Sequence, residues 1–168
     1  FADHMQGSQA ADWLHGRDGN DVLIGGEGAD VLEGEEGDDL LEGDAGNDRL
    51  YGGAGVNVLR GGEGSDLLVS NGADDQLIGG TGDDIYYLGS GLATVSEDAN
   101  GGVDAIHLAP GASLVFQAPD QVENVQILND LYLESTQRVD LVGNVLDNQL
   151  SGPNQLDGQG GNDILVGV

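Results

Sequence analysis

The feature that most constrains this chain is an aspartate that recurs every ninth residue over the first half of the sequence. A large apolar side chain follows each aspartate by two positions, and a glycine precedes most of them by five. One unit therefore reads G-G-x-G-x-D-x-L-x, and it is clearest in GGEGADVLE at 25–33 and GGEGSDLLV at 61–69. The members of the column are Asp3, Asp12, Asp21, Asp30, Asp39, Asp48, Asn57, Asp66, Asp75 and Asp84.

A nine-residue period does not fit a helix, in which each interior glycine costs about 1 kcal/mol. It fits a turn of about six residues, for which glycine is suited, followed by about three residues of strand. Side chains alternate along a strand, so the middle residue points inward and its two neighbours point outward. The inward column is then Met5, Leu14, Leu23, Leu32, Leu41, Leu50, Leu59, Leu68, Leu77 and Tyr86.

Two units make one flat coil of about 18 residues, and coils that stack about 4.8 Å apart form a parallel β-solenoid. The sequence therefore predicts an all-β fold whose core is the column of inward leucines.

The composition indicates that such a chain needs a partner of opposite charge. It has 31 glycines and a formal net charge of −27, and low aromatic content with high charge is typical of chains that stay disordered on their own. This charge disfavours nucleic acid and anionic membranes and favours a cation. There is no cysteine for disulfides, and no apolar run reaches the roughly 18 residues of a membrane span. Because the chain begins without methionine and ends within a repeat, we expect a piece of a longer protein.

Stacked coils place each aspartate over the one two units later, for example Asp21 over Asp39. Like charges a few ångströms apart repel unless a cation lies between them. Carboxylates and turn carbonyls suit Ca²⁺, whereas zinc prefers cysteine and histidine, and magnesium is poorly held by all-protein sites. The three histidines do not cluster in the sequence. Turn capping by aspartate is the structural alternative, and the long register favours the metal.

The repeats resemble those of the RTX (repeats-in-toxin) family, whose calcium-binding nonapeptide has this pattern. The resemblance covers 1–87 almost continuously and returns at 143–168. It implies a right-handed parallel β-roll with Ca²⁺ between the turns. We expect 1–87 to form regular coils, 88–142 to form irregular coils of the same solenoid, with short strands within 92–98, 103–109, 113–118 and 124–128, and 143–168 to form a second, shorter repeat block.

The resemblance also implies how each ion is held. One turn supplies its aspartate and the carbonyl oxygens of its second and fourth residues, and the facing turn supplies its aspartate and the carbonyls of its first and third. The implied carbonyl ligands are those of Ser8, Ala10, Arg17, Gly19, Gly25, Gly26, Glu27, Gly28, Gly34, Glu35, Glu36, Gly37, Gly43, Asp44, Ala45, Gly46, Gly52, Gly53, Ala54, Gly55, Gly61, Gly62, Glu63, Gly64, Gly79 and Thr81.

The column allows eight pairs of facing turns. We expect the two pairs that contain Asn57 to be weaker, because an amide contributes no charge. Asn148 facing Asp163 is a ninth pair, so the resemblance implies about six to nine ions per chain.

Together these expectations predict a domain that is disordered without Ca²⁺ and folds on binding it. Free Ca²⁺ is scarce inside bacteria and plentiful outside. RTX proteins are typically secreted by type I machinery, so the implied location is extracellular or the bacterial cell surface. The implied partners are that machinery and the remainder of the parent chain, which the domain would stabilise.

Two other classes of function remain as alternatives: an enzyme, and a module that binds a polysaccharide or a cell surface. Some parallel β-solenoids are carbohydrate-active enzymes, but this chain has no lysine and four arginines, and we predict no catalytic residue in it. His107 is expected to be an outward strand residue, while the parent remains open as a protease, lipase, carbohydrate-active enzyme or toxin. One outward face carries Trp13, Tyr51 and Tyr87 and is a candidate surface for a polysaccharide or cell-surface ligand, as in an adhesin.

Overall fold

The computed structural model describes residues 1–72, 74–89, 93–98, 101–109, 114–127, 139–152 and 155–167. Within these ranges all regular secondary structure is strand, and no helix occurs. Accordingly, the described part of the chain contains no helix that is long and apolar enough to cross a membrane.

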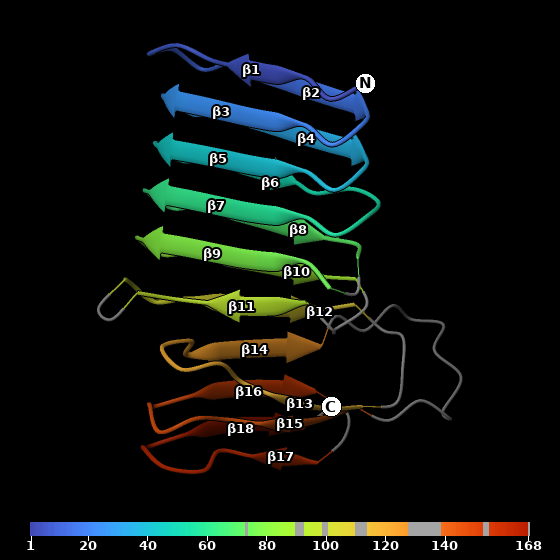
Figure 1. Ribbon diagram of the computed structural model, residues 1–168. Coiled ribbons are helices and arrows are strands. Elements are labelled where there is room, and N and C mark those ends of the chain that lie inside the picture. The colour runs from blue at the N-terminus through green and yellow to red at the C-terminus, as the bar shows by residue number, and fades with distance from the viewer. Residues whose placement is uncertain are drawn as a thin grey trace.

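From β1 (His4–Gln6) to β12 (Ala105–Leu108) the chain alternates between two parallel sheets that face each other (Figure 1). The first sheet contains β1 (His4–Gln6), β3 (Val22–Glu27), β5 (Leu40–Ala45), β7 (Val58–Glu63), β9 (Gln76–Thr81) and β11 (Thr94–Ser96). The second contains β2 (Trp13–Asp18), β4 (Val31–Glu36), β6 (Arg49–Tyr51), β8 (Leu67–Ser70), β10 (Ile85–Leu88), β12 (Ala105–Leu108), β14 (Asn124–Ile127), β16 (Gln149–Gly152) and β18 (Ile164–Gly167).

The pairing register confirms the parallel solenoid and its coil of two units. Leu23 pairs with Leu41, which pairs with Leu59, and the same offset holds across both sheets up to β10. Every inward residue from Leu23 to Tyr86 is fully buried. The predicted core column is therefore confirmed, and because Met5 and Leu14 lie in the outermost coil they are only partly covered.

The irregular coils keep the second sheet in register although their lengths differ. Strands occur in all four predicted segments, and β12, β14 and β16 continue the sheet, with Ile106, Val125 and Leu150 in the inward place. A third sheet is formed by β13 (Leu114–Gln117), β15 (Val139–Val142) and β17 (Leu156–Asp157). The division of the chain into three blocks stays a prediction.

The strands extend into the segments that the sequence predicts to be turns. In both sheets strands such as β3 extend to the third residue of the following repeat, and Gly26 pairs with Asp44. Stacked turns of one shape continue the backbone hydrogen bonds of the strands, which is why the strands are longer than predicted.

Glycine is required most strictly at the fourth residue of the unit. Gly28 and Gly46 there have φ of 130° and 142°, and a Cβ on Gly46 would collide with the carbonyl of Gly28 in the preceding coil. The second residue is less strained, and Glu35 and Asp44 occupy it with φ of 74° and 71°. Where the fourth place stacks closely on a preceding turn, as at Gly46, only a residue without a side chain fits, whereas an ordinary residue at the second place accepts a left-handed backbone.

Candidate metal centres

Each turn is tied to the next turn on its edge through the aspartate column. The backbone N–H of Asp30 donates to Oδ1 of Asp48 at 2.7 Å, and that of Asp48 donates to Oδ1 of Asp66 at 2.8 Å. All eight predicted pairs are brought together in this way, as is the ninth, in which Asn148 donates to Asp163 at 2.9 Å.

These pairs lie on two edges of the solenoid. Edge A, which precedes the strands of the first sheet, carries Asp3, Asp21, Asp39, Asn57 and Asp75. Edge B, which precedes the strands of the second sheet, carries Asp12, Asp30, Asp48, Asp66 and Asp84.

The second carboxylate oxygen of most column members has no partner. Oδ2 is buried without any hydrogen bond at Asp21, Asp30, Asp39, Asp48, Asp66 and Asp84. These residues are at most 3% exposed, so water does not hydrate the free oxygen. Burying an unpaired charge is costly, and such a row of atoms indicates an electrostatic need that the chain itself does not meet.

The space beside these oxygens is kept open by the first glycine of the unit. A Cβ on Gly25 would collide with Oδ2 of Asp30 and lie 2.8 Å from the carbonyl oxygen of Gly43 in the next coil. The carboxylate oxygen and the carbonyl of the facing turn therefore converge on one spot. Carboxylate plus carbonyl oxygen is the donor set of a hard cation, and the residues present fit calcium.

Part of the implied carbonyl set already accepts hydrogen bonds from the neighbouring coil. The N–H of Gly28 donates to the carbonyl of Ala45 at 2.8 Å, and that of Gly46 donates to Glu63 at the same distance. The same role falls to the carbonyls of Ser8, Glu35, Glu36, Ala54 and Thr81. A carbonyl oxygen has two lone pairs, so these bonds leave one available for a metal.

Burial makes the aspartates reluctant to ionise in the absence of a cation. Burial is the main cause that raises the pKa of the Asp66 carboxyl to about 6 and that of Asp84 to about 7; neighbouring carboxylates contribute to this rise, and a backbone N–H bond opposes it. The pKa values of Asp39 and Asp48 are raised for the same reason, loss of hydration.

Turn capping accounts for only one of the two carboxylate oxygens of each aspartate. Asn57 accepts the N–H of Asp39 at 2.9 Å through its single oxygen, so an amide performs the cap without a charge. The chain nevertheless places a buried carboxylate at most positions of the column. The uncapped oxygen is what remains to be explained, and a bound cation explains it.

Three positions of the column depart from this pattern. Ser70 occupies the place of the first glycine, and its hydroxyl donates to Oδ2 of Asp75 at 2.6 Å, so this oxygen is satisfied within the chain. Asp3 is exposed and Asp12 partly exposed, because they lie in the terminal coil. Oδ2 of Asp12 accepts hydrogen bonds from the backbone and hydroxyl of Ser8.

The structure also extends the column beyond the residues that the nine-residue spacing predicts. Asp84 donates its N–H to Asp104 at 2.9 Å, and Asp104 donates to Glu123 at 2.8 Å. A sequence signal for both existed: each precedes an inward apolar residue by two positions, as in the repeats. Asp104 lies 20 residues after Asp84, and Glu123 lies 19 residues after Asp104, instead of the 18 residues of two full units. The nine-residue spacing therefore did not predict them. Glu97, which joins Asp84 and Asp104 in a cluster of carboxylates, had no such signal.

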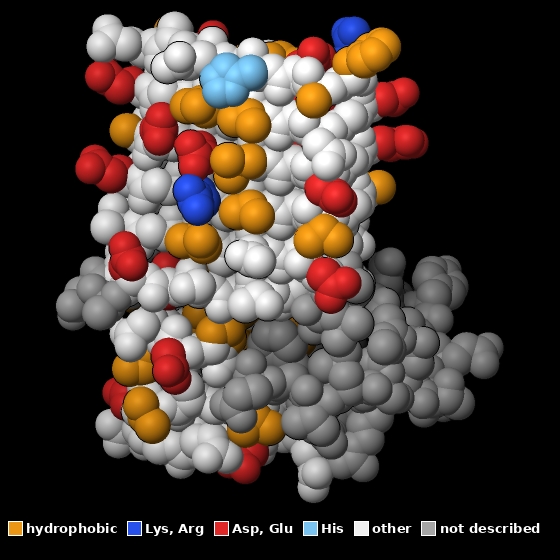
Figure 2. All heavy atoms as spheres, in the orientation of Figure 1, with side chains coloured by type: hydrophobic (Ala, Val, Ile, Leu, Met, Phe, Trp, Pro, Cys, Tyr) orange, Lys and Arg blue, Asp and Glu red, His pale blue; other side chains and the backbone are white. Residues whose placement is uncertain are grey.

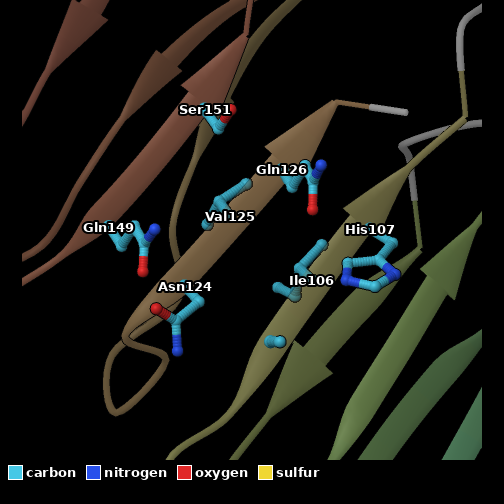
Figure 3. Close-up of a pocket in the computed structure, with 8 residues that line it drawn as sticks. Ile106, His107, Asn124, Val125, Gln126, Gln149 and Ser151 are labelled. Carbon is cyan, nitrogen blue, oxygen red and sulfur yellow. The ribbon is translucent and has the colours of Figure 1, made fainter. Parts of the chain in front are cut away.

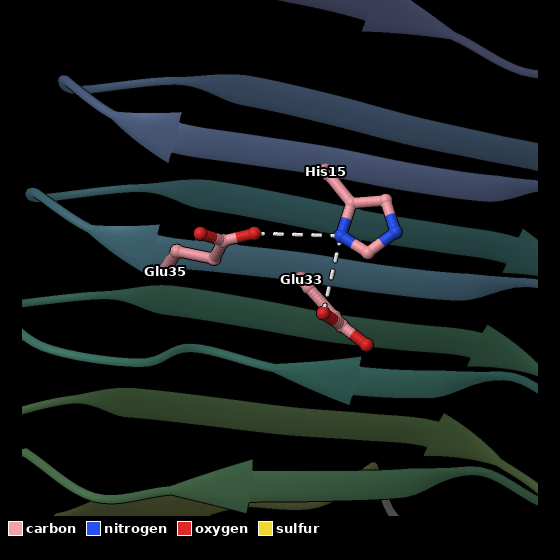
Figure 4. Close-up of side chains that lie close together, drawn as sticks. All are labelled: His15, Glu33 and Glu35. Atoms are coloured by element: carbon pink, nitrogen blue, oxygen red, sulfur yellow. Dashed lines mark ion pairs between the residues drawn. The ribbon is translucent and has the colours of Figure 1, made fainter.

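Two further groups lie on the outer face of the second sheet. Nδ1 of His15 is 3.1 Å from Glu33 and 3.4 Å from Glu35 (Figure 4). A shallow hollow over β12, β14 and β16 is lined largely by amide and small polar side chains, with His107 at one side (Figure 3). The ring of His107 packs edge-on against Tyr87, and its side chain faces outward, as predicted.

The fold and the stacked ligand turns define a class of protein, the parallel β-solenoids with acidic turns. The family model for the RTX calcium-binding nonapeptide repeat, in four copies, matches residues 1–32, 24–59, 33–68, 60–92 and 150–167. These segments cover more than half of the chain, which therefore belongs to the RTX calcium-binding repeat family. No curated protein and no solved structure matches the chain.

Proposed function

We propose that this chain is a calcium-dependent folding domain, disordered without Ca²⁺ and ordered on binding it after type I secretion, which stabilises a larger extracellular protein. The observation that carries the proposal is the row of buried aspartate oxygens without partners. In water these oxygens are hydrated, and in the solenoid they are not. The folded chain therefore gains most from a cation, and binding adds its free energy to folding.

The residues that would hold the ions are the column aspartates and the implied turn carbonyls. Bound Ca²⁺ would supply positive charge between facing carboxylates. Edge A and edge B would order the turns, while the inward leucines close the core between them. The proposal assigns no catalytic residue to the chain, since RTX repeat domains are typically structural.

Secretion is supported by the family, whose repeats are typical of type I secretion substrates. Millimolar Ca²⁺ outside the cell and its scarcity inside would separate the two states of the chain. The net charge of −27 would keep the unfolded form extended during export, because like charges repel along the chain.

Circular dichroism tests the proposal. The chain in EDTA should give a coil spectrum and should change to a β spectrum in millimolar Ca²⁺, while equal Mg²⁺ should produce much less change. A β spectrum that persists in EDTA at neutral pH would contradict it.

A polysaccharide or cell-surface ligand is a second proposal for the outer face of the second sheet. Trp13 is 65% exposed and stacks on His15 with ring centroids 5.1 Å apart, which leaves an indole face suited to a sugar ring. Quenching or enhancement of the single tryptophan by soluble polysaccharides, lost in Trp13→Ala, would support it. No change with neutral or acidic polysaccharides would contradict it.

A further inference from the structure

The last regular turn of edge B, which carries Asp84, lies close to Glu97, a residue outside the nonapeptide repeats. In the pairing of β11 with β9, Ser96 lies beside Ile78, so Glu97 follows at the register of Gly79. In the regular coils this place belongs to the first glycine of the unit. Here it carries a glutamate, whose carboxylate reaches the last regular aspartate of edge B.

Oxygen atoms from four residues converge at this point. Ligand atoms of Asp84, Glu97 and Asp104 all lie within 4.8 Å of one another. The hydroxyl of Tyr86 donates to Oε1 of Glu97. A Cβ on Gly79 would collide with the Tyr86 hydroxyl, Oδ2 of Asp84 and Oε1 of Glu97 together, so these three oxygens surround one small space.

Asp84 and Asp104 are buried and Glu97 is partly exposed, and the negative charge of the cluster is not balanced by the described residues that form it. Asp84 and Asp104 are each 1% exposed and Tyr86 is fully buried. One oxygen of Asp84 has no hydrogen bond. The backbone N–H of Gly80 reaches Oε2 of Glu97 only at 3.4 Å. Three carboxylates this close together, two of them shielded from water, are strongly unfavourable without a cation.

We propose that Asp84, Glu97 and Asp104, with the hydroxyl of Tyr86, form a site for a hard divalent cation in which a glutamate from outside the nonapeptide repeat is a ligand. This site rests on the proposed calcium-dependent function and adds a ligand set with one more carboxylate than a repeat pair. More carboxylates raise Ca²⁺ affinity, so this is the tightest site of the chain. It joins the last regular coil to the first irregular coil.

The alternative is a neutral cluster in which Asp84, Glu97 and Asp104 are all protonated and Glu97 is hydrogen-bonded to Tyr86. A neutral cluster needs no ion and would tolerate glutamine at 97 without any effect on calcium. The two explanations therefore differ in ion stoichiometry.

The test compares Glu97→Gln with Asp98→Asn, which removes the same charge from the exposed neighbouring residue. Calcium stoichiometry is measured by equilibrium dialysis and isothermal titration. We expect Glu97→Gln to lose one ion per chain, or to bind its tightest ion about tenfold more weakly, and Asp98→Asn to match the wild type. Equal stoichiometry and affinity in both variants would overturn the site while leaving calcium-dependent folding intact.

Terbium supplies a second readout that does not depend on Glu97→Gln folding. Tyr86 lies at the site, so its excitation should sensitise a bound lanthanide. Tyr86→Phe, which keeps the ring in the core, should lower terbium luminescence relative to Tyr51→Phe on the outer face. Equal luminescence in both variants would overturn the site. Failure of the wild type to bind any calcium would instead overturn the proposed function, and this site with it.

Discussion

Edge A and edge B are built from the same nine-residue unit, yet only one of them carries an unbroken line of charge. On edge A the column is interrupted after Asp39 by the uncharged amide of Asn57. The next member is Asp75, whose Oδ2 accepts a hydrogen bond from Ser70, and Ala93 occupies the following position in the register. On edge B an aspartate stands in each coil from Asp12 to Asp104, namely Asp12, Asp30, Asp48, Asp66, Asp84 and Asp104.

The difference teaches that turn shape and charge are separable properties of this repeat. Both edges have the same register and are followed by fully buried leucines, so the fold does not require a carboxylate at each turn. Both margins of the face in Figure 2 nevertheless carry acidic side chains, with hydrophobic side chains between them. Because the aspartate column is continuous from Asp12 to Asp104 only on edge B, we expect edge B to have the greatest need for bound cations.

The largest effect should fall on what the edges share. Leu59→Ala in the first sheet and Leu68→Ala in the second each remove a fully buried side chain, so each should cost about 2–5 kcal/mol of unfolding free energy in Ca²⁺. Urea denaturation measures both, with the outward Val58→Ala as a less costly control. A large difference between the two leucines would mean that packing, not charge, distinguishes the edges.

Removing one carboxylate should separate the edges. Asp66→Asn and Asp75→Asn both keep an oxygen for the cap. The first also removes an unpartnered buried charge, whereas the second removes one already bonded to Ser70. We expect Asp66→Asn to raise the Ca²⁺ midpoint by about tenfold and Asp75→Asn by no more than about threefold. Equal midpoints, measured by circular dichroism, would refute the comparison.

Acid should partly replace calcium. The pKa of Asp66 is about 6 and that of Asp84 about 7 in the metal-free fold, against an ordinary 3.8 for each. The folded form therefore binds more protons than the unfolded form between about pH 4 and pH 7, and folding in EDTA should become more favourable as pH falls through this window. The β signal in EDTA should rise from pH 7.5 to pH 5.

Two controls accompany the acid experiment. The double variant Asp66→Asn with Asp84→Asn should weaken the response, because two of the buried groups with a raised pKa are removed. In the presence of calcium the direction should reverse, since protons compete with the metal for carboxylates, and the Ca²⁺ midpoint should rise as pH falls. A metal-free β signal that is constant from pH 7.5 to pH 5 would show that the buried carboxyls do not limit folding.

The smallest effect should come from restoring charge to edge A. Asn57→Asp places a carboxylate between Asp39 and Asp75 and should lower the Ca²⁺ midpoint by about twofold to threefold. Asn47→Asp, on the exposed outer side of a turn, is the matched control and should leave the midpoint unchanged. If both variants behave alike, the effect is one of overall charge rather than of the column.

Periodicity was sufficient to predict the fold over the regular coils. The inward leucines, the parallel register and the stacking of aspartates two units apart all follow from side-chain alternation and coil length. The predicted site pairs were brought together, although ion binding by them stays a proposal. Spacing alone failed where coil length changed, so it did not reveal Asp104 or Glu123.

Side-chain insertion was the other limit. Glu97 and Ser70 both take the place of the first glycine, but Glu97 adds a charge to its edge whereas Ser70 donates a hydrogen bond to an aspartate oxygen. Nothing in a nine-residue pattern distinguishes these outcomes, because they depend on where a side chain ends inside the stack.

One coil consumes two units, so the array has a reading frame. Gain or loss of one nonapeptide would move every later strand to the opposite sheet and exchange edge A with edge B, whereas a change of two units would leave all faces in place. Beyond the repeats this frame is kept by other means: Asp84 and Asp104 are 20 residues apart, and Asn148 and Asp163 only 15, yet β10, β12, β16 and β18 remain in one sheet. The number of residues in a turn therefore varies in this chain, whereas the side of the solenoid to which each successive strand belongs does not.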